Sequence, residues 1–166
     1  GDAWLSPSTL AATPDGHTLF VGCVTGERVL VLDPASRRVT RSVGMPAPVT
    51  GMAVSTDGKT LFVTCAAPES QVCVVNAARG RVTARLRAGH SACAPVLSPD
   101  GQTLFVCNRF NNDVSVFDLA ARKEIRRVAV RREPVAAAIT RDGRRLLVAN
   151  HLHAGRADVE HVGAVV

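Results

Sequence analysis

Hydrophobic and polar residues alternate most regularly in residues 81–87. Apolar side chains occupy positions 82, 84 and 86, and polar side chains occupy the odd positions between them. Such a period of two is typical of a strand with one buried and one wet face. Residues 60–65 are instead apolar on both faces, which indicates a strand covered on both sides, and residues 71–76 are predicted to form a further strand. With the apolar stretch 49–55, these segments predict four strands of about six residues joined by short turns.

One short phrase recurs four times along the chain. Its copies are Thr13-Pro14-Asp15-Gly16, Ser55-Thr56-Asp57-Gly58, Ser98-Pro99-Asp100-Gly101 and Thr140-Arg141-Asp142-Gly143. The aspartates lie 42, 43 and 42 residues apart, and an apolar run such as Leu61-Phe62-Val63 follows each copy. Each Asp-Gly pair predicts a two-residue hairpin turn, because both residues tolerate positive φ. A period of this length with four antiparallel strands indicates a β-propeller blade.

The predicted fold class is therefore all-β, a propeller with four-stranded antiparallel blades. Third strands at 29–33 and 114–118 and half-polar fourth strands at 38–43 and 123–130 repeat the pattern, and the fourth strand is expected outermost. We expect a single partial domain over 1–166, with blades at about 6–44, 47–88, 92–130 and 133–166. Closed propellers need about four to eight blades. Three blades plus half of a fourth therefore predict a piece of a longer protein, and a closed four-bladed ring is the alternative.

Residues 97–108 and 113–118 carry a family resemblance. They read Leu-Ser-Pro-Asp-Gly-Gln-Thr-Leu-Phe-Val-Cys-Asn and Asp-Val-Ser-Val-Phe-Asp, and the fourth period keeps Leu147-Val148-Ala149-Asn150. This pattern resembles the YVTN-type bacterial propeller repeat, over about residues 6–150. The tyrosine of that repeat is Phe or Leu in every copy here. Cys23 and Cys65 stand where later copies have Asn108 and Asn150, so the asparagine position does not form one uniform ring.

The resemblance implies a secreted, periplasmic or cell-surface protein. Some members of the family carry a c-type cytochrome module after the propeller, and some relatives resemble lactonases or amine dehydrogenase heavy chains. We expect a non-catalytic binding or scaffold platform in an exported bacterial protein. Its expected partners are the remaining blades of the same protein and a cytochrome or another protein. The alternatives are a propeller enzyme of lactonase-like or amine-dehydrogenase-like type and a surface-layer adhesive module.

Charge and cysteine content narrow these classes. The net charge is +6, and 18 of the 20 basic residues are arginines, most of them on fourth strands, where charge prevents edge-to-edge pairing. Aromatic residues make up only 4%, so the stacking surface for nucleic acid is missing. No run of 18 apolar residues predicts a membrane span. The five cysteines form no Cys-x-x-Cys-His motif, so no cofactor is expected; buried thiols are the expectation, and a Cys65–Cys73 disulfide is the alternative.

Propeller geometry predicts where a site would lie. The loops between second and third strands and the links between blades share one rim, and function is usually carried there. The expected ligand-binding residues on this rim are His90, Arg109, Asn111, Arg132, His151 and His153. Two guanidinium groups would suit a carboxylate or phosphate.

Catalytic and metal sites are not predicted. His151-x-His153 with His161 invites a metal interpretation, but the spacing fixes no further ligand. Ser91 beside His90 lacks the nucleophile elbow of serine hydrolases. The Asp or Asn that ends each third strand (Asp33, Asn76 and Asp118) is interpreted as a turn cap, since it recurs in every period.

Overall fold

The computed structural model describes residues 5–152, which form antiparallel β-sheets; this part of the chain contains no helix. The first sheet consists of β1 (Pro7–Ala12), β2 (Leu19–Cys23), β3 (Arg28–Asp33) and β4 (Arg38–Gly44). The second consists of β5 (Val49–Val54), β6 (Thr60–Cys65), β7 (Gln71–Asn76) and β8 (Arg81–Arg87). The third consists of β9 (Ala92–Leu97), β10 (Thr103–Asn108), β11 (Asp113–Asp118) and β12 (Lys123–Ala129), and a fourth sheet pairs β13 (Pro134–Ile139) with β14 (Leu146–Asn150).

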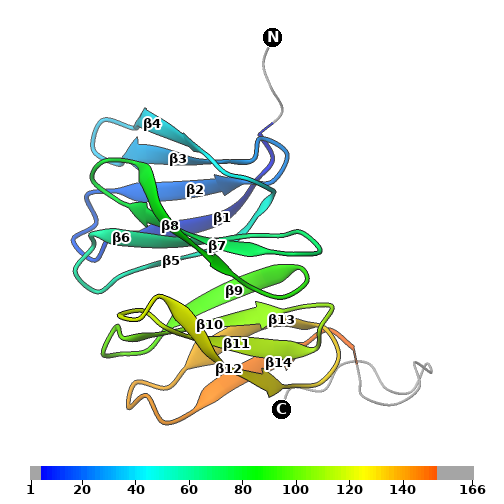
Figure 1. Cartoon of the computed structure of the whole chain (residues 1–166). Coiled ribbons are helices and arrows are strands. Elements are labelled where there is room, and N and C mark those ends of the chain that lie inside the picture. The colour runs from blue at the N-terminus through cyan, green and yellow to red at the C-terminus, as the bar shows by residue number, and fades with distance from the viewer. Residues whose placement is uncertain (1–4, 153–166) are drawn as a thin grey trace.

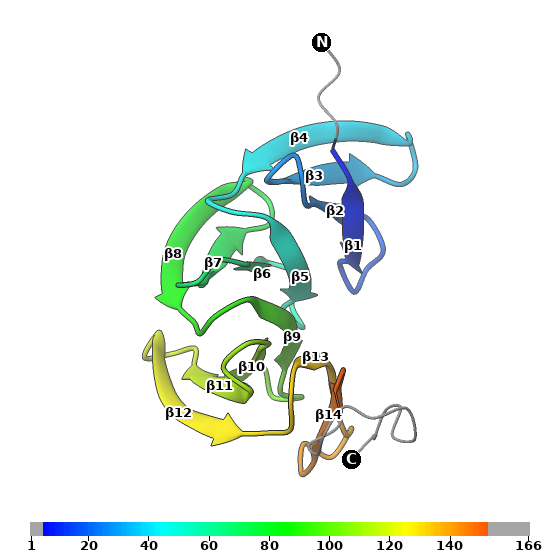
Figure 2. The same cartoon turned by 90° about the vertical axis from the view of Figure 1, so that its right-hand side faces the viewer.

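The sheets are arranged like the blades of a fan (Figures 1 and 2). Each four-stranded sheet runs in sequence order, from an inner first strand to an outer fourth strand. The inner strands contact one another in succession, β1 with β5, β5 with β9 and β9 with β13. The architecture is thus that of a β-propeller, with three four-stranded sheets and a two-stranded sheet in the described residues, as the repeat predicts.

The hydrophobic core lies between successive sheets rather than within one layer. Phe20, Val31 and Val43 of the first sheet pack with Val49 and Leu61 of the second. A further cluster joins the second and third sheets through Phe62, Val72, Leu104 and Phe117. The β2, β6 and β10 strands are accordingly covered on both faces, whereas β4, β8 and β12 are largely exposed.

The Asp-Gly turns differ from the prediction in length. The glycines do have positive φ, near 70° in all four copies. However, six residues separate β1 from β2, so the two-residue hairpin was wrong. The threonine or serine that opens the loop explains the difference. Thr13 accepts a hydrogen bond from the Gly16 amide at 2.8 Å through its carbonyl and one from the Thr18 amide at 3.0 Å through its hydroxyl, which closes a wider loop.

The described residues include no helix long and apolar enough to cross a bilayer. All five cysteines are free thiols, so the alternative of a Cys65–Cys73 disulfide is not realised in this structure.

Candidate functional site

One backbone hydrogen bond recurs at the rim where strands two and three of each sheet are joined. The residue after the second strand donates its amide to the carbonyl of the residue immediately before the first strand of its own sheet. These bonds are Val24 N to Ser6 O at 3.0 Å, Ala66 N to Pro48 O at 2.9 Å, Arg109 N to Ser91 O at 3.2 Å and His151 N to Glu133 O at 2.8 Å. Because the main chain fixes this position, only its side chain changes between blades, from Val and Ala to Arg and His.

At this rim Arg109 and His151 meet at one carboxylate. The Arg109 guanidinium donates to Glu133 Oε2 from Nε at 2.9 Å and from Nη2 at 2.7 Å. His151 Nδ1 lies 3.4 Å from the same oxygen and 3.4 Å from Arg109 Nη2. Glu133 adopts a φ of 54°, and its amide donates to Asn112 Oδ1 at 2.9 Å, which fixes the carboxylate over Arg109.

The ion pair sets the charge of Glu133. Hydrogen bonding from Arg109 lowers the pKa of this carboxyl below its usual value, and His151 acts in the same direction. A charged partner that hydrogen-bonds the ionised form always has this effect. Glu133 is therefore a permanent anion at neutral pH and holds Arg109 in a fixed orientation.

An exposed aromatic ring extends the site toward the preceding link. Phe110 is 52% exposed, and the Arg109 guanidinium lies 5.2 Å from its ring centre. The His90 ring meets Phe110 edge-on at 5.1 Å. The His90 amide donates to Asn111 Oδ1 at 2.5 Å, so Asn111 holds the link against the β10–β11 loop. We name this group the rim cluster; it comprises His90, Arg109, Phe110, Asn111, Glu133 and His151.

Buried polar groups support the rim cluster from below. Asn108 is completely buried; it accepts from the Gly89 amide at 2.8 Å and donates to Asp113 at 2.6 Å and Ser115 at 2.7 Å. A Cβ on Gly89 would lie 2.3 Å from Asn111 Oδ1 and 2.6 Å from Asn108 Cγ. Only glycine fits there, so the approach of this link to the β10–β11 loop depends on it.

The structure brings four of the six predicted site residues together. Arg109 and His151 share Glu133, and His90 and Asn111 join them through Phe110 and the Gly89 link. Arg132 is exposed on the same link, next to Glu133, and its carbonyl accepts from the Leu152 amide at 3.3 Å. His153 and His161 lie outside the described residues.

The sequence prediction missed Glu133 and Phe110. Both stand in the loops that the prediction placed on this rim, and a lone acidic residue among arginines was the available signal for Glu133. Within residues 5–152, no group of three or more His, Cys, Asp or Glu side chains is arranged to hold a metal ion.

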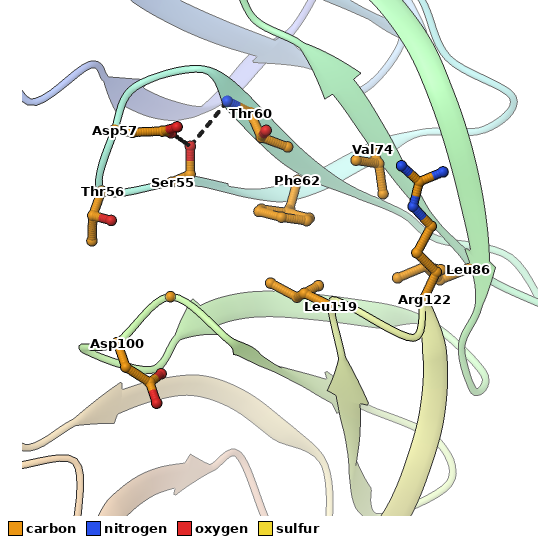
Figure 3. A pocket seen from close by; sticks show the side chains of 11 residues that line it. Ser55, Thr56, Asp57, Thr60, Phe62, Val74, Leu86, Asp100, Leu119 and Arg122 are labelled. Atoms are coloured by element: carbon orange, nitrogen blue, oxygen red, sulfur yellow. Dashed lines mark hydrogen bonds between the residues drawn. The ribbon is translucent and has the colours of Figure 1, made fainter.

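Two cavities lie at the opposite rim, among the Asp-Gly turns. One of about 380 Å³ lies between the second and third sheets, with Phe62, Val74, Leu86 and Leu119 on its walls (Figure 3). A second of about 340 Å³ occupies the equivalent place between the first and second sheets. The cavities recur with the repeat, and the carboxylates at their mouths are used in the turns; Asp57, for example, accepts from the Ser55 hydroxyl. They are thus consequences of blade packing rather than the most promising site.

Comparisons with known proteins agree with this architecture. Residues 13–155 match the family described as lactonase, 7-bladed β-propeller. No curated protein matches the sequence. Among solved structures, a chain of hydrazine synthase from Kuenenia stuttgartiensis is similar, with a TM-score of 0.85 and 26% identity over 90% of this chain and 43% of that one.

Two further solved structures share the fold alone. These are U3-55K and the WD40 repeats of RRP9, each with a TM-score of 0.80 and 17% identity over 91% of this chain and 47% of the other. The chain thus spans less than half the length of each of these three structures.

Proposed function

This chain belongs to the lactonase family of seven-bladed β-propellers, and from that premise we propose that it is a non-catalytic binding platform whose contact surface is the rim cluster. The partner that fits best is an acidic protein surface. This part of the rim carries three positive charges, on Arg109, Arg131 and Arg132, and one negative charge, on Glu133. The local net charge is therefore positive.

The ion pair between Glu133 and Arg109 is the observation that carries the proposal. A carboxylate with a lowered pKa is a poor proton carrier at neutral pH, since a general base works best with a pKa near the working pH. The pair instead holds an arginine and the exposed Phe110 in a fixed arrangement. Arginine and aromatic side chains are enriched at protein–protein interfaces, where they often dominate the binding energy.

We infer a wider setting for this platform from the repeat pattern. The YVTN-type resemblance favours an exported bacterial protein, in the periplasm or at the cell surface. In hydrazine synthase the matched region makes up 43% of its chain, so a similar arc there is part of a longer polypeptide. By analogy, the first partners of this arc are further blades of the same protein, and a c-type cytochrome module is a further candidate partner.

A lactonase-like hydrolase is the second candidate, favoured by the family match. Glu133 Oε2 and His151 Nδ1 lie 3.4 Å apart, which is a spacing at which a carboxylate orients an imidazole. In that function Glu133 and His151 would act on a water molecule that attacks the lactone carbonyl.

Replacing Glu133→Gln distinguishes the two functions, because it has opposite effects on them. Lactone hydrolysis is followed in a pH-stat, and binding is measured with an octaglutamate peptide as the acidic probe. Glu133→Gln removes the carboxylate that competes with the probe for Arg109. If the chain is a binding platform, its affinity for the probe therefore rises about fivefold, equivalent to about 1 kcal/mol. Glu27→Gln changes the net charge equally on the rim of the first sheet and is the matched control, expected to have a smaller effect.

The outcomes separate clearly. Probe binding that strengthens in Glu133→Gln and weakens in Arg109→Gln supports the platform. Lactone turnover by the wild-type chain that Glu133→Gln abolishes overturns it in favour of the hydrolase. Equal affinities for octaglutamate in wild type, Glu133→Gln and Arg109→Gln also contradict the proposal.

A further inference from the structure

Two buried thiols lie together at the rim end of the second sheet. Cys65 is the last residue of β6, and Cys73 lies on the neighbouring β7; their sulfur atoms are 4.0 Å apart, and the side chains are 1% and 0% exposed. Cys65 pairs with Gln71 and Val63 pairs with Cys73, so Cys65, Gln71 and Cys73 share one face of the sheet. This face is turned toward the first sheet, and both cysteines belong to the same core cluster as Val43 of β4 and Met45 of the link that follows it.

In the third sheet the side chains at the same diagonal positions also contact each other, but through a hydrogen bond. There Asn108 and Ser115 occupy the places of Cys65 and Cys73, and they hydrogen-bond at 2.7 Å. In the first sheet the places hold Cys23 and Leu30. The repeat therefore brings two side chains together at this point, and among the three four-stranded sheets both side chains end in sulfur only in the second.

This placement is poorly suited to a disulfide. Diagonal residues on adjacent strands have Cα atoms roughly 7–8 Å apart. A disulfide requires about 4.4–6.8 Å. The thiols are thus expected to stay reduced unless the backbone moves, and both are free in the structure.

The spacing does suit one soft metal ion between the sulfurs. With metal–sulfur distances of about 2.3 Å, two sulfurs 4.0 Å apart subtend an angle of about 120° at the ion. We propose that Cys65 and Cys73 bind a single monovalent soft cation of the Cu(I) class, with the Gln71 side chain beside it. Thiolate ligands select Cu(I) over hard cations.

Two further observations support this site. Gln71 Oε1 is buried and has no hydrogen-bond partner among the described residues. A cavity of about 60 Å³, lined by Cys65, Gln71 and the exposed Glu69, lies on the Cys65 side of the pair and offers an entry path from the rim.

Charge balance favours a monovalent ion. Binding releases one proton from each thiol, and two thiolates with Cu(I) carry a net charge of −1. Arg85 pairs with Cys73 across β7 and β8, so its guanidinium is placed to neutralise that charge. No electron transfer is required, because the ion is supplied as Cu(I).

The test is an anaerobic titration of the reduced full chain with Cu(I), in competition with bicinchoninate. We expect one Cu(I) per chain to be withdrawn from the chelator, and Cys65→Ser or Cys73→Ser to weaken binding by more than the roughly 100-fold that outer-shell changes cause. Cys23→Ser is the matched control, because Cys23 is the repeat equivalent of Cys65 and faces Leu30 instead of a thiol. It is expected to bind as the wild type does.

Thiol alkylation followed by mass spectrometry gives an independent readout that does not rely on variants. Because both thiols are buried, the reaction with iodoacetamide is run at a urea concentration below the unfolding midpoint, where local opening exposes them. Bound Cu(I) should slow the alkylation of Cys65 and Cys73 more than that of Cys93. A chain that takes no Cu(I) from bicinchoninate, or equal affinity after removal of both thiols, would overturn the proposal.

Discussion

Asn108 and Gly89 determine how the third blade holds its link to the second. The buried Asn108 amide joins this link to β11 through three hydrogen bonds. Gly89 lets the link approach closely enough for its amide to reach Asn108. At this scale the stability of the rim cluster depends on residues that no ligand would touch.

Gly89→Ala should destabilise the chain by about 2 kcal/mol or more, because the added methyl group would overlap Asn108 and Asn111 in a packed region. Urea unfolding followed by circular dichroism measures the change. Gly44→Ala is the matched control, since a Cβ there meets nothing within 4 Å, and its effect should stay within about 0.5 kcal/mol. Equal effects of the two substitutions would show that the link relaxes around the methyl group.

Single residues were also where the sequence prediction was least complete. Loop position alone placed Arg109 and His151 on one rim, because the repeat fixes which loops share it. The role of Glu133 could not be read in the same way. It depends on a positive φ and on the bond from its amide to Asn112, which are set by packing between blades.

Elements followed the hydrophobic pattern closely. Alternation in 81–87 and the two-sided apolar run in 60–65 correspond to β8 and β6 with the same bounds. The turn length was wrong, because a Ser or Thr hydroxyl closes the loop and this interaction leaves no hydrophobic signature. The four loops share one hydrogen-bonding pattern. The aspartate carboxylate accepts one bond from the hydroxyl of the Ser or Thr that opens the loop and one from the amide two residues after the aspartate, as Asp57 does.

These turns should make the fold sensitive to acid. Hydrogen bonding from the Ser55 hydroxyl and then from the Lys59 amide lowers the pKa of Asp57, and Asp15, Asp100 and Asp142 behave alike. A folded-state pKa below the unfolded value stabilises the fold fully above about pH 4, and this contribution disappears as the pH falls through the folded-state pKa. Urea midpoints should thus fall between pH 6 and 3.

Asp57→Asn removes one of these titrations while keeping an acceptor oxygen. Its urea midpoint should decline less steeply with falling pH than that of the wild type. Parallel slopes for the two proteins would mean that other carboxyl groups cause the acid sensitivity.

At the scale of the whole molecule, the described residues form an open arc with an apolar face at each end. Leu10 on the first sheet is 66% exposed, and Leu147 on the last sheet is 55% exposed. Leu147 occupies the repeat position of Phe20 and Phe62, which are buried against the next sheet. Large exposed apolar faces of this kind are unusual on a soluble monomer.

The 166-residue chain studied alone should therefore self-associate, which sedimentation velocity at several concentrations would detect. Joint replacement of Leu10→Ser and Leu147→Ser should shift the distribution toward monomer. Val39→Ser with Ile125→Ser alters two apolar residues on the outer strands that are also more than half exposed, and is the matched control. A monomer at all concentrations for the wild-type chain would contradict this expectation.

The main-chain bond that anchors residues 24, 66, 109 and 151 has one more consequence. Since it uses no side-chain atoms, a substitution at these four positions leaves the bond in place unless the new residue is proline. The binding specificity of the rim can thus be changed by substitutions in one blade at a time, without changing core residues. Charged residues introduced at Val24 and Ala66 would extend the contact surface around the axis, so this arc would be a suitable scaffold for engineered binders.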